Sequence, residues 1–142
     1  MVNWLPGASL EILRHRADLL AKLRAFFAEK EILEVETPAL ASAPVTDLHI
    51  QSLSTEILEN NSLKTFYLQT SPEFAMKRLL ACNATSIYQI AKVFRHDPLS
   101  KQHNPEFTLL EWYRPGFTMN QLMDEVSELL CSLFTCTSVP AF

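Results

Sequence analysis

The residues best suited to chemistry lie in one stretch, from Arg95 to Tyr113. Arg95 follows an apolar run at the end of an expected strand, and a second strand is expected from Glu106 to Tyr113 after a polar loop. A guanidinium binds phosphate oxygens through paired hydrogen bonds, an aromatic ring stacks on a base, and a carboxylate binds an ammonium group. The stretch therefore favours a phosphate-bearing aromatic ligand and an amine.

Four side chains of this stretch have a role that their chemistry alone suggests. Arg95 and His103 can donate hydrogen bonds to phosphate oxygens, Phe107 can stack on a base, and Glu111 can accept from an ammonium group. Each of them also has a plainer explanation, because an arginine at a strand end or a histidine in a loop is usually a solvated surface residue. Their combination within one predicted hairpin is harder to explain as structure alone.

Periodicity and turn signals outline the elements that must position these side chains. The expected order is a helix capped by Ser9 and ending near Glu29, a strand at 32–37, strands across 48–69 around a turn at 60–61, a helix beginning at 71–73, strands at 87–94 and 106–113, and a helix after Thr118. An antiparallel β-sheet flanked by helices is the simplest arrangement. The sequence therefore predicts a single α+β domain over residues 1–142.

The predicted helix start at Ser71-Pro72-Glu73 allows two interpretations. A serine, a proline and an acidic residue in this order are typical of the first turn of a helix, where a carboxylate is stabilised by the helix dipole. The same carboxylate could instead form a second wall of an amine-binding site.

Composition excludes several kinds of function. With only two glycines, the chain cannot build a glycine-rich phosphate-binding loop or a dinucleotide fingerprint. The formal net charge of −4 gives nucleic-acid binding no electrostatic support. No apolar run approaches the roughly eighteen residues of a membrane span, and no export leader is evident, so we expect a cytoplasmic protein.

The three cysteines, Cys82, Cys131 and Cys136, are too few and too scattered for a shared structural role. They are odd in number and contain no C-x-x-C pair, so neither a disulfide framework nor a zinc site is indicated. We expect them to be small buried hydrophobic residues.

Several motifs resemble those of the class II aminoacyl-tRNA synthetases of the lysine type. Glu34-Val35-Glu36-Thr37-Pro38, after a long helix, resembles motif 1 (about 26–38), and Phe94-Arg95 with His103-Asn104-Pro105-Glu106-Phe107-Thr108 resembles motif 2 (about 93–113). Within this family, Thr70-Ser71-Pro72-Glu73, Met76-Lys77-Arg78-Leu79-Leu80 and Glu111-Trp112-Tyr113-Arg114-Pro115 most resemble the branch of elongation factor P (R)-β-lysine ligases. The similarity covers residues 9 to 134.

The resemblance implies an ATP-dependent ligase with a class II catalytic-domain fold. In the implied reaction, the carboxylate of (R)-β-lysine, or of lysine, attacks the α-phosphate of ATP to give an aminoacyl adenylate and pyrophosphate. A lysine amine of elongation factor P then accepts the acyl group. The resemblance also implies Mg²⁺ as the companion of ATP and a homodimer formed through motif 1.

The resemblance also implies roles for individual residues. Arg95 would be catalytic, because it would contact the α-phosphate and stabilise the charge that develops in the transition state. The implied ATP-binding residues are Arg95, His96, Asp97, His103, Asn104 and Phe107. The implied substrate-binding residues are Ser71, Pro72, Glu73, Glu111 and Tyr113.

The chain departs from the family pattern at three points. Glu31 occupies a position where motif 1 usually has glycine, so a backbone with positive φ would be strained there. Asp97 is shorter than the usual motif 2 acid. The third motif, with a second ATP-binding arginine, and the acidic metal ligands are absent, so we expect half a site, no metal site and no activity from the 142 residues alone.

Two other hypotheses remain open. The chain could be a catalytic fragment of a lysyl-tRNA synthetase that aminoacylates tRNA, or a noncatalytic dimerisation module whose ATP site has decayed. The family's first helix begins about ten residues after Met1, which leaves no room for an anticodon-binding domain ahead of it, and the chain is acidic. Both observations favour a protein acceptor over tRNA.

Overall fold

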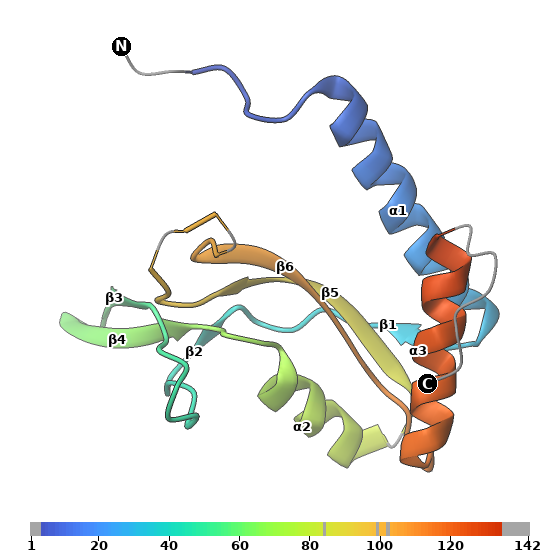
Figure 1. Ribbon diagram of the computed structural model, residues 1–142. Helices are drawn as coiled ribbons and strands as arrows, with labels where there is room; N and C mark the ends of the chain where they lie inside the picture. Colours follow the sequence, from blue (N-terminus) through green and yellow to red (C-terminus); the bar gives the residue numbers. More distant parts are fainter. Residues whose placement is uncertain (1–3, 84, 99, 102, 135–142) are drawn as a thin grey trace. The chain divides into compact units, whose positions relative to one another are not determined.

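A computed structural model describes residues 4–83, 85–98, 100–101 and 103–134 (Figure 1). The element order is α1 (Leu10–Glu29), β1 (Leu33–Glu34), β2 (Leu40–Ala41), β3 (Ser54–Glu59), β4 (Ser62–Leu68), α2 (Glu73–Asn83), β5 (Ile87–Phe94), β6 (Glu106–Tyr113) and α3 (Met119–Leu133). This order confirms the predicted α+β class. Within the described part of the chain, no helix combines the length and apolar character needed to cross a bilayer.

The chain divides into two compact units, which are described separately. The first comprises α1 and α3, and the second comprises the six strands and α2. The second unit, residues 33–115, holds every residue that the sequence assigns to a ligand site.

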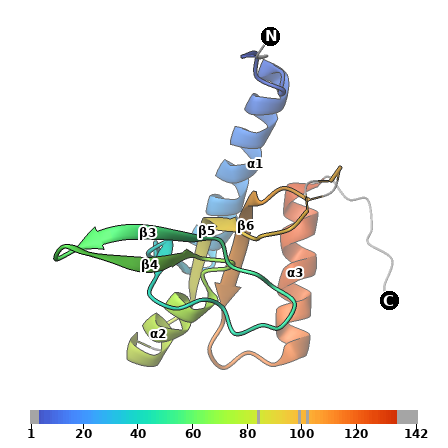
Figure 2. The ribbon, with the colours of Figure 1, turned by 90° about the vertical axis from the view of Figure 1, so that its left-hand side faces the viewer.

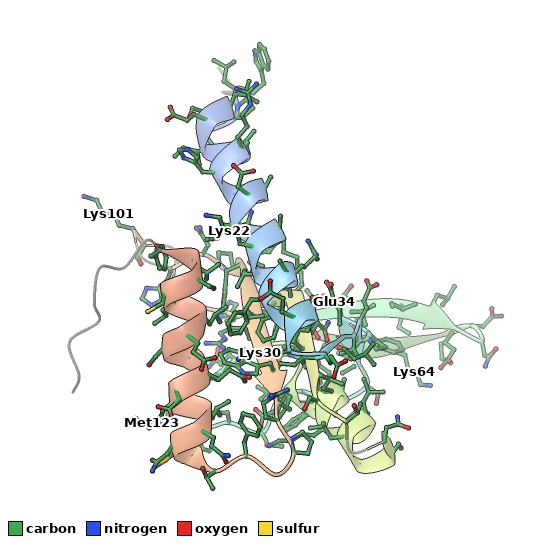
Figure 3. The ribbon with its side chains drawn as sticks, turned by 90° about the vertical axis from the view of Figure 1, so that its right-hand side faces the viewer. Lys22, Lys30, Glu34, Lys64, Lys101 and Met123 are labelled. Atoms are coloured by element: carbon green, nitrogen blue, oxygen red, sulfur yellow. The ribbon has the colours of Figure 1, made fainter. Side chains whose placement is uncertain are left out.

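In the first unit, α1 begins as predicted, with the Ser9 Oγ accepting a hydrogen bond from the Ile12 N–H at 3.3 Å. Its core contacts concentrate near its end, where Phe26 and Phe27 pack edge to face with centroids 5.4 Å apart. Lys30 lies just beyond that end (Figure 3), and its Nζ pairs with Glu128 of α3 at 2.5 Å. Apolar packing and the ion pair between Lys30 and Glu128 therefore help to join the two helices.

The end of α1 adopts a Schellman motif with a glutamate at the position that usually holds glycine. The Ile32 N–H donates to the Phe27 carbonyl at 2.9 Å, and the Glu31 N–H donates to the Ala28 carbonyl at 3.0 Å. Glu31 accordingly has φ of 54°, in the left-handed region, where a β-carbon is unfavourable. Motif 1 usually has glycine at this position, which predicted a positive φ there, and the structure confirms that prediction.

Replacing Glu31 with glycine is expected to raise the free energy of unfolding by about 1 kcal/mol, because it removes the β-carbon from a left-handed residue. Urea unfolding monitored by circular dichroism measures the change. Glu29→Gly is the matched control: Glu29 is the last residue of α1, and glycine in a helix is unfavourable by about 1 kcal/mol. Destabilisation by both substitutions would contradict the assignment of strain to Glu31.

In the second unit, β5 and β6 form a long antiparallel ladder from Ile87↔Tyr113 to Phe94↔Glu106. The short strand β1 pairs with β5 in parallel, with Leu33 opposite Ile87. Only Leu33–Glu34 of the strand expected at 32–37 has strand geometry, although the Val35 N–H still donates to the Tyr88 carbonyl at 2.9 Å. This sheet, β1-β5-β6, is thus mostly but not wholly antiparallel.

The other strands form a second antiparallel sheet in the order β2-β4-β3. Figure 2 shows β3 and β4 side by side as a hairpin, which reverses at Asn60 and Asn61. These two residues have φ of 50° and 61°, as a two-residue type I′ turn requires. The predicted turn is confirmed, while the single expected sheet is divided into two.

Helix α3 begins with the predicted capping box, in which the Thr118 N–H donates to the Gln121 Oε1 at 2.8 Å and the Thr118 Oγ1 accepts from the Gln121 N–H. The expectation for the cysteines was wrong at Cys82 and Cys131. Both side chains are exposed, so each lies on a solvent-facing part of its helix and not in a core. Cys136 lies outside the described residues.

Candidate functional site

Three of the predicted site residues share one face of the β5-β6 ladder. Residues of one strand alternate between the two faces of a sheet, so Phe107, Glu111 and Tyr113 of β6 lie on the same face. The Arg95 N–H extends the ladder by donating to the Pro105 carbonyl at 2.9 Å, which places Arg95 on this face as well. The hairpin predicted from the sequence therefore presents a guanidinium, an aromatic ring and a carboxylate in one row.

Arg95 and Phe107 are in direct contact at one end of this row. The guanidinium carbon lies 5.1 Å from the centroid of the Phe107 ring, and the Arg95 Nε donates to the Thr70 carbonyl at 3.2 Å. These two contacts fix the side chain. Among the described residues its terminal nitrogens have no other partner, so they remain able to bind an anion.

Glu111 and Tyr113 form a hydrogen-bonded pair at the other end of the row. The Tyr113 hydroxyl donates to the Glu111 Oε1 at 2.5 Å. Burial raises the pKa of Glu111, the Tyr113 hydrogen bond opposes this rise, the charge of Glu73 adds to it, and the charge of Lys77 lowers the pKa. Burial and the Glu111 hydrogen bond hold the pKa of Tyr113 well above its usual range. Tyr113 therefore stays a hydrogen-bond donor at any physiological pH.

The segment Ser71-Pro72-Glu73 lies between the strand β4 and the helix α2. The helix begins at Glu73, one residue later than predicted, and its first bond runs from the Met76 N–H to the Pro72 carbonyl at 2.9 Å. The Ser71 Oγ accepts from the Glu73 N–H at 3.3 Å, and Pro72 is fully buried. Glu73 is half-exposed and pairs with Lys77 one turn along the helix at 2.5 Å.

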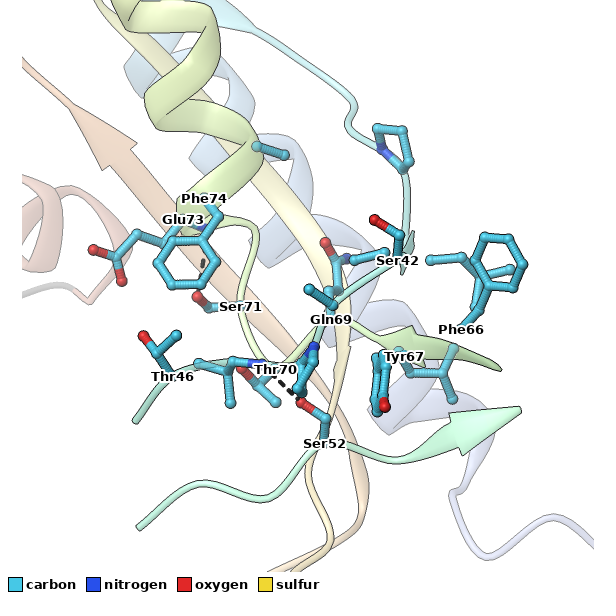
Figure 4. A pocket seen from close by; sticks show the side chains of 18 of the residues that line it. Ser42, Thr46, Ser52, Phe66, Tyr67, Gln69, Thr70, Ser71, Glu73 and Phe74 are labelled. Carbon is cyan, nitrogen blue, oxygen red and sulfur yellow. Dashed lines mark hydrogen bonds between the residues drawn. The ribbon is translucent and has the colours of Figure 1, made fainter. Parts of the chain in front are cut away.

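A cavity of about 590 Å³ borders this segment (Figure 4). Its walls are the 38–46 segment, the end of β4 and the first turn of α2, and the Val45 N–H braces one wall by donating to the Ser52 Oγ at 3.2 Å. Ser71 and Glu73 line the cavity, whereas Arg95, Glu111 and Tyr113 do not. The Gln69 Oε1 is a buried acceptor that has no hydrogen-bond partner among the residues that the structure describes, and Gln69 belongs to the cavity wall.

The remaining predicted ATP-binding residues belong to the connection between β5 and β6. His96 and Asp97 follow Arg95, and the His96 N–H donates to the Gln51 carbonyl at 2.9 Å. His103 is exposed, and its ring Nδ1 lies 3.0 Å from the Ser100 Oγ. Asn104 is exposed beside it. The structure thus gathers these residues in one loop next to Arg95, on the solvent side.

Two site residues were missed by the sequence analysis. Lys77 pairs with Glu73, a contact that the spacing of four residues could have predicted. Gln89 is buried in β5 directly opposite Glu111, where it accepts a hydrogen bond from the Thr37 Oγ1 at 2.9 Å. A polar residue inside the apolar run of β5 was the available signal, but its partner is 52 residues away.

The described side chains include groups suited to a nucleotide but no cluster of metal ligands. A stacked arginine with unused nitrogens beside an aromatic ring suits a nucleotide phosphate and its base. In contrast, no group of three metal-ligating side chains occurs among the described residues. The chemistry of Arg95 and Phe107 is thus suited to a phosphate and a base.

Comparison with known proteins places these features in a family. The sequence profile of the tRNA synthetases class II (D, K and N) matches residues 3–140. The elongation factor P (R)-β-lysine ligase of Haemophilus ducreyi is 47% identical over 99% of the chain and 44% of its own length. The enzymes of the same name from Vibrio vulnificus and Vibrio cholerae are 50% and 49% identical, over 94% and 96% of the chain and 42% and 43% of their own lengths.

The chain thus spans less than half the length of these curated relatives. The profile match covers nearly the whole chain and includes both segments that resemble motifs 1 and 2. On this evidence, and in agreement with the resemblance found in its motifs, the chain belongs to the class II tRNA synthetase family of the D, K and N type.

Proposed function

We propose that this chain forms the ATP- and amine-binding half of an elongation factor P (R)-β-lysine ligase. The observation that carries the proposal is the row on the β5-β6 face, with Arg95 stacked on Phe107 at one end and Glu111 bonded to Tyr113 at the other. A β-lysyl adenylate has the same order of groups, from purine and phosphate to ammonium. The names of the relatives supply the acceptor, elongation factor P.

Each residue of the row has a task in the proposed reaction. Arg95, fixed by Thr70 and Phe107, directs its terminal nitrogens at the α-phosphate, where negative charge develops as the carboxylate attacks. Phe107 offers its ring to the purine. Asp97, His96, His103 and Asn104 lie in the adjoining loop and complete the nucleotide contacts. ATP, which Mg²⁺ would accompany, would supply the adenylyl group that activates the carboxylate, and pyrophosphate would leave.

The amine of the substrate is held at the other end. Glu111 accepts from the ammonium, and Tyr113 holds the Glu111 carboxylate in place through its hydroxyl. Ser71, Pro72 and Glu73 form the adjacent wall, which borders the cavity. Because the pKa of Glu111 is raised, its carboxylate takes up a proton at a higher pH than an ordinary carboxylate does, so amine binding should weaken at a correspondingly higher pH on acidification.

The proposal also names the substrate, the acceptor protein, the cellular location and the oligomeric state. β-Lysine or lysine is the small-molecule substrate, elongation factor P the acceptor and the cytoplasm the site of action. A homodimer through motif 1, residues 26–38, completes the assembly. Because the 142 residues span less than half the length of the curated relatives, the proposal is tested by binding and not by turnover.

Calorimetry with non-reactive sulfamoyl analogues of the aminoacyl adenylate tests the proposal on the chain itself. The (R)-β-lysyl analogue is expected to bind about tenfold more tightly than the α-lysyl analogue, a difference of about 1.4 kcal/mol. Tighter binding of the α-lysyl analogue would favour a lysyl-tRNA synthetase fragment. Failure of both analogues to bind would favour the noncatalytic dimerisation module.

A further inference from the structure

Glu73, Lys77 and Glu111 form a group of charges at the amine end of the row. Glu73 and Lys77 lie one turn apart on α2, and the Lys77 Nζ is 2.5 Å from the Glu73 Oε1. Glu111 lies across from them on β6, close enough for the charges of both Glu73 and Lys77 to act on it. Lys77 thus pairs directly with Glu73, and its positive charge also acts on Glu111.

The surroundings of Glu111 show why this cation matters. Tyr113 on the same strand donates a hydrogen bond to it, and the opposite residue on β5 is Gln89, which is uncharged. On α2, the negative charge of Glu73 raises the pKa of Glu111, and the positive charge of Lys77 lowers it. Without Lys77, two like charges would face each other in a half-buried site, which favours protonation of one of them.

We propose that Lys77 is a positioning residue of the amine site: its ammonium holds Glu73 at the cavity wall and acts as the internal counter-ion of Glu73 and Glu111 until a substrate ammonium replaces it. The identity of that ammonium rests on the proposed function. The plainer alternative is that Lys77 only stabilises α2, since exposed pairs at this spacing contribute about 0.3–0.5 kcal/mol.

The exposure of the Glu73–Lys77 ion pair supports the view that another ammonium can take the place of Lys77. Both side chains are about half exposed, 57% for Lys77 and 44% for Glu73, so the ammonium can move into solvent without leaving a buried charge behind. Glu73 also lines the cavity, whereas Lys77 does not. An incoming ammonium can therefore approach the carboxylate from the cavity side while Lys77 leaves from the solvent side.

The test compares Lys77→Met, which keeps the length of the side chain but removes its charge, with Lys77→Arg, which keeps the charge. Nuclear magnetic resonance of carboxyl carbons follows the titration of Glu111, with Glu111→Gln assigning the signal. Cadaverine at about pH 8 is the binding probe, because it then carries two ammonium groups and has neither a carboxylate nor a nucleotide. It therefore reports on the amine site independently of ATP.

In Lys77→Met the pKa of Glu111 should rise, because the charge that lowers it is gone, and it should stay near the wild-type value in Lys77→Arg. Cadaverine should bind Lys77→Met about fivefold more tightly than wild type, the effect of removing one competing unit charge at about 4 Å in water. Lys77→Arg should bind it as wild type does.

An unchanged Glu111 titration in Lys77→Met, with only a lower melting temperature, would show that Lys77 merely stabilises α2 and would overturn the proposal. A raised pKa of Glu111 in Lys77→Met without tighter cadaverine binding would also overturn the proposal, because it would show that no external ammonium replaces Lys77. Failure of the proposed function looks different: the preference for the (R)-β-lysyl analogue would be absent while the response to cadaverine persisted.

Discussion

Replacing Arg95 with alanine is expected to weaken binding of the (R)-β-lysyl adenylate analogue by about a hundredfold. Hydrogen bonds to a charged group contribute about 1.5–3 kcal/mol each, and each 1.4 kcal/mol changes affinity tenfold. Loss of the guanidinium also removes the group that packs on Phe107 and anchors to the Thr70 carbonyl. Calorimetry on the wild type and on Arg95→Ala measures the effect.

Lys92→Ala is the matched control for this experiment. Lys92 is a cation on the same strand, but it lies on the opposite face, where it pairs with Glu106 at 2.9 Å. Its loss should change analogue affinity less than twofold, because surface pairs contribute about 0–1 kcal/mol and this one faces away from the row. Equal losses in the two variants would mean that general charge, and not the Arg95 site, determines binding.

Replacing Phe27 with alanine is expected to lower the free energy of unfolding by about 4 kcal/mol. The side chain has no exposed surface and packs edge to face on Phe26 near the end of α1. Truncation of a buried phenylalanine removes its transfer free energy and leaves a cavity, which together amount to about 3–5 kcal/mol. Thermal and urea unfolding followed by circular dichroism measure the loss.

Leu13→Ala provides the comparison within the same helix. Leu13 is 50% exposed, so its truncation should lower the free energy of unfolding by about 1 kcal/mol or less. A loss at Leu13 as large as that at Phe27 would indicate that the first turns of α1 are covered in solution. That outcome would contradict the exposure of Leu13 in the structure.

The features that the sequence predicted well are those set by neighbours in the chain. Ser9 and Thr118 cap their helices through bonds to residues three positions on, and Asn60 and Asn61 turn the β3-β4 hairpin through their own backbone angles. The row on β6 follows from the alternation of side chains along a strand. Even the strain at Glu31 could be anticipated, because the need for glycine is local.

The features that the sequence could not supply depend on contacts between distant residues. Nothing in Leu33 and Glu34 specifies that they pair in parallel with β5. The bond from Arg95 to the Thr70 carbonyl and the packing of Arg95 on Phe107 join segments whose proximity is set by the fold. The pairing of Gln89 with Thr37 and the exposure of Cys82 and Cys131 likewise depend on which surfaces meet.

The parallel pairing of β1 with β5 has a consequence for folding kinetics. Tyr88 donates a hydrogen bond to Glu34 across 54 residues of chain, so this contact forms only after a long loop closes. Hairpins such as β3-β4 and β5-β6 form on a scale of about 1–10 μs, whereas contacts of high sequence separation slow folding to about milliseconds or longer. During synthesis, β1 therefore cannot pair with β5 until β5 has left the ribosome, and the second unit stays incomplete until then.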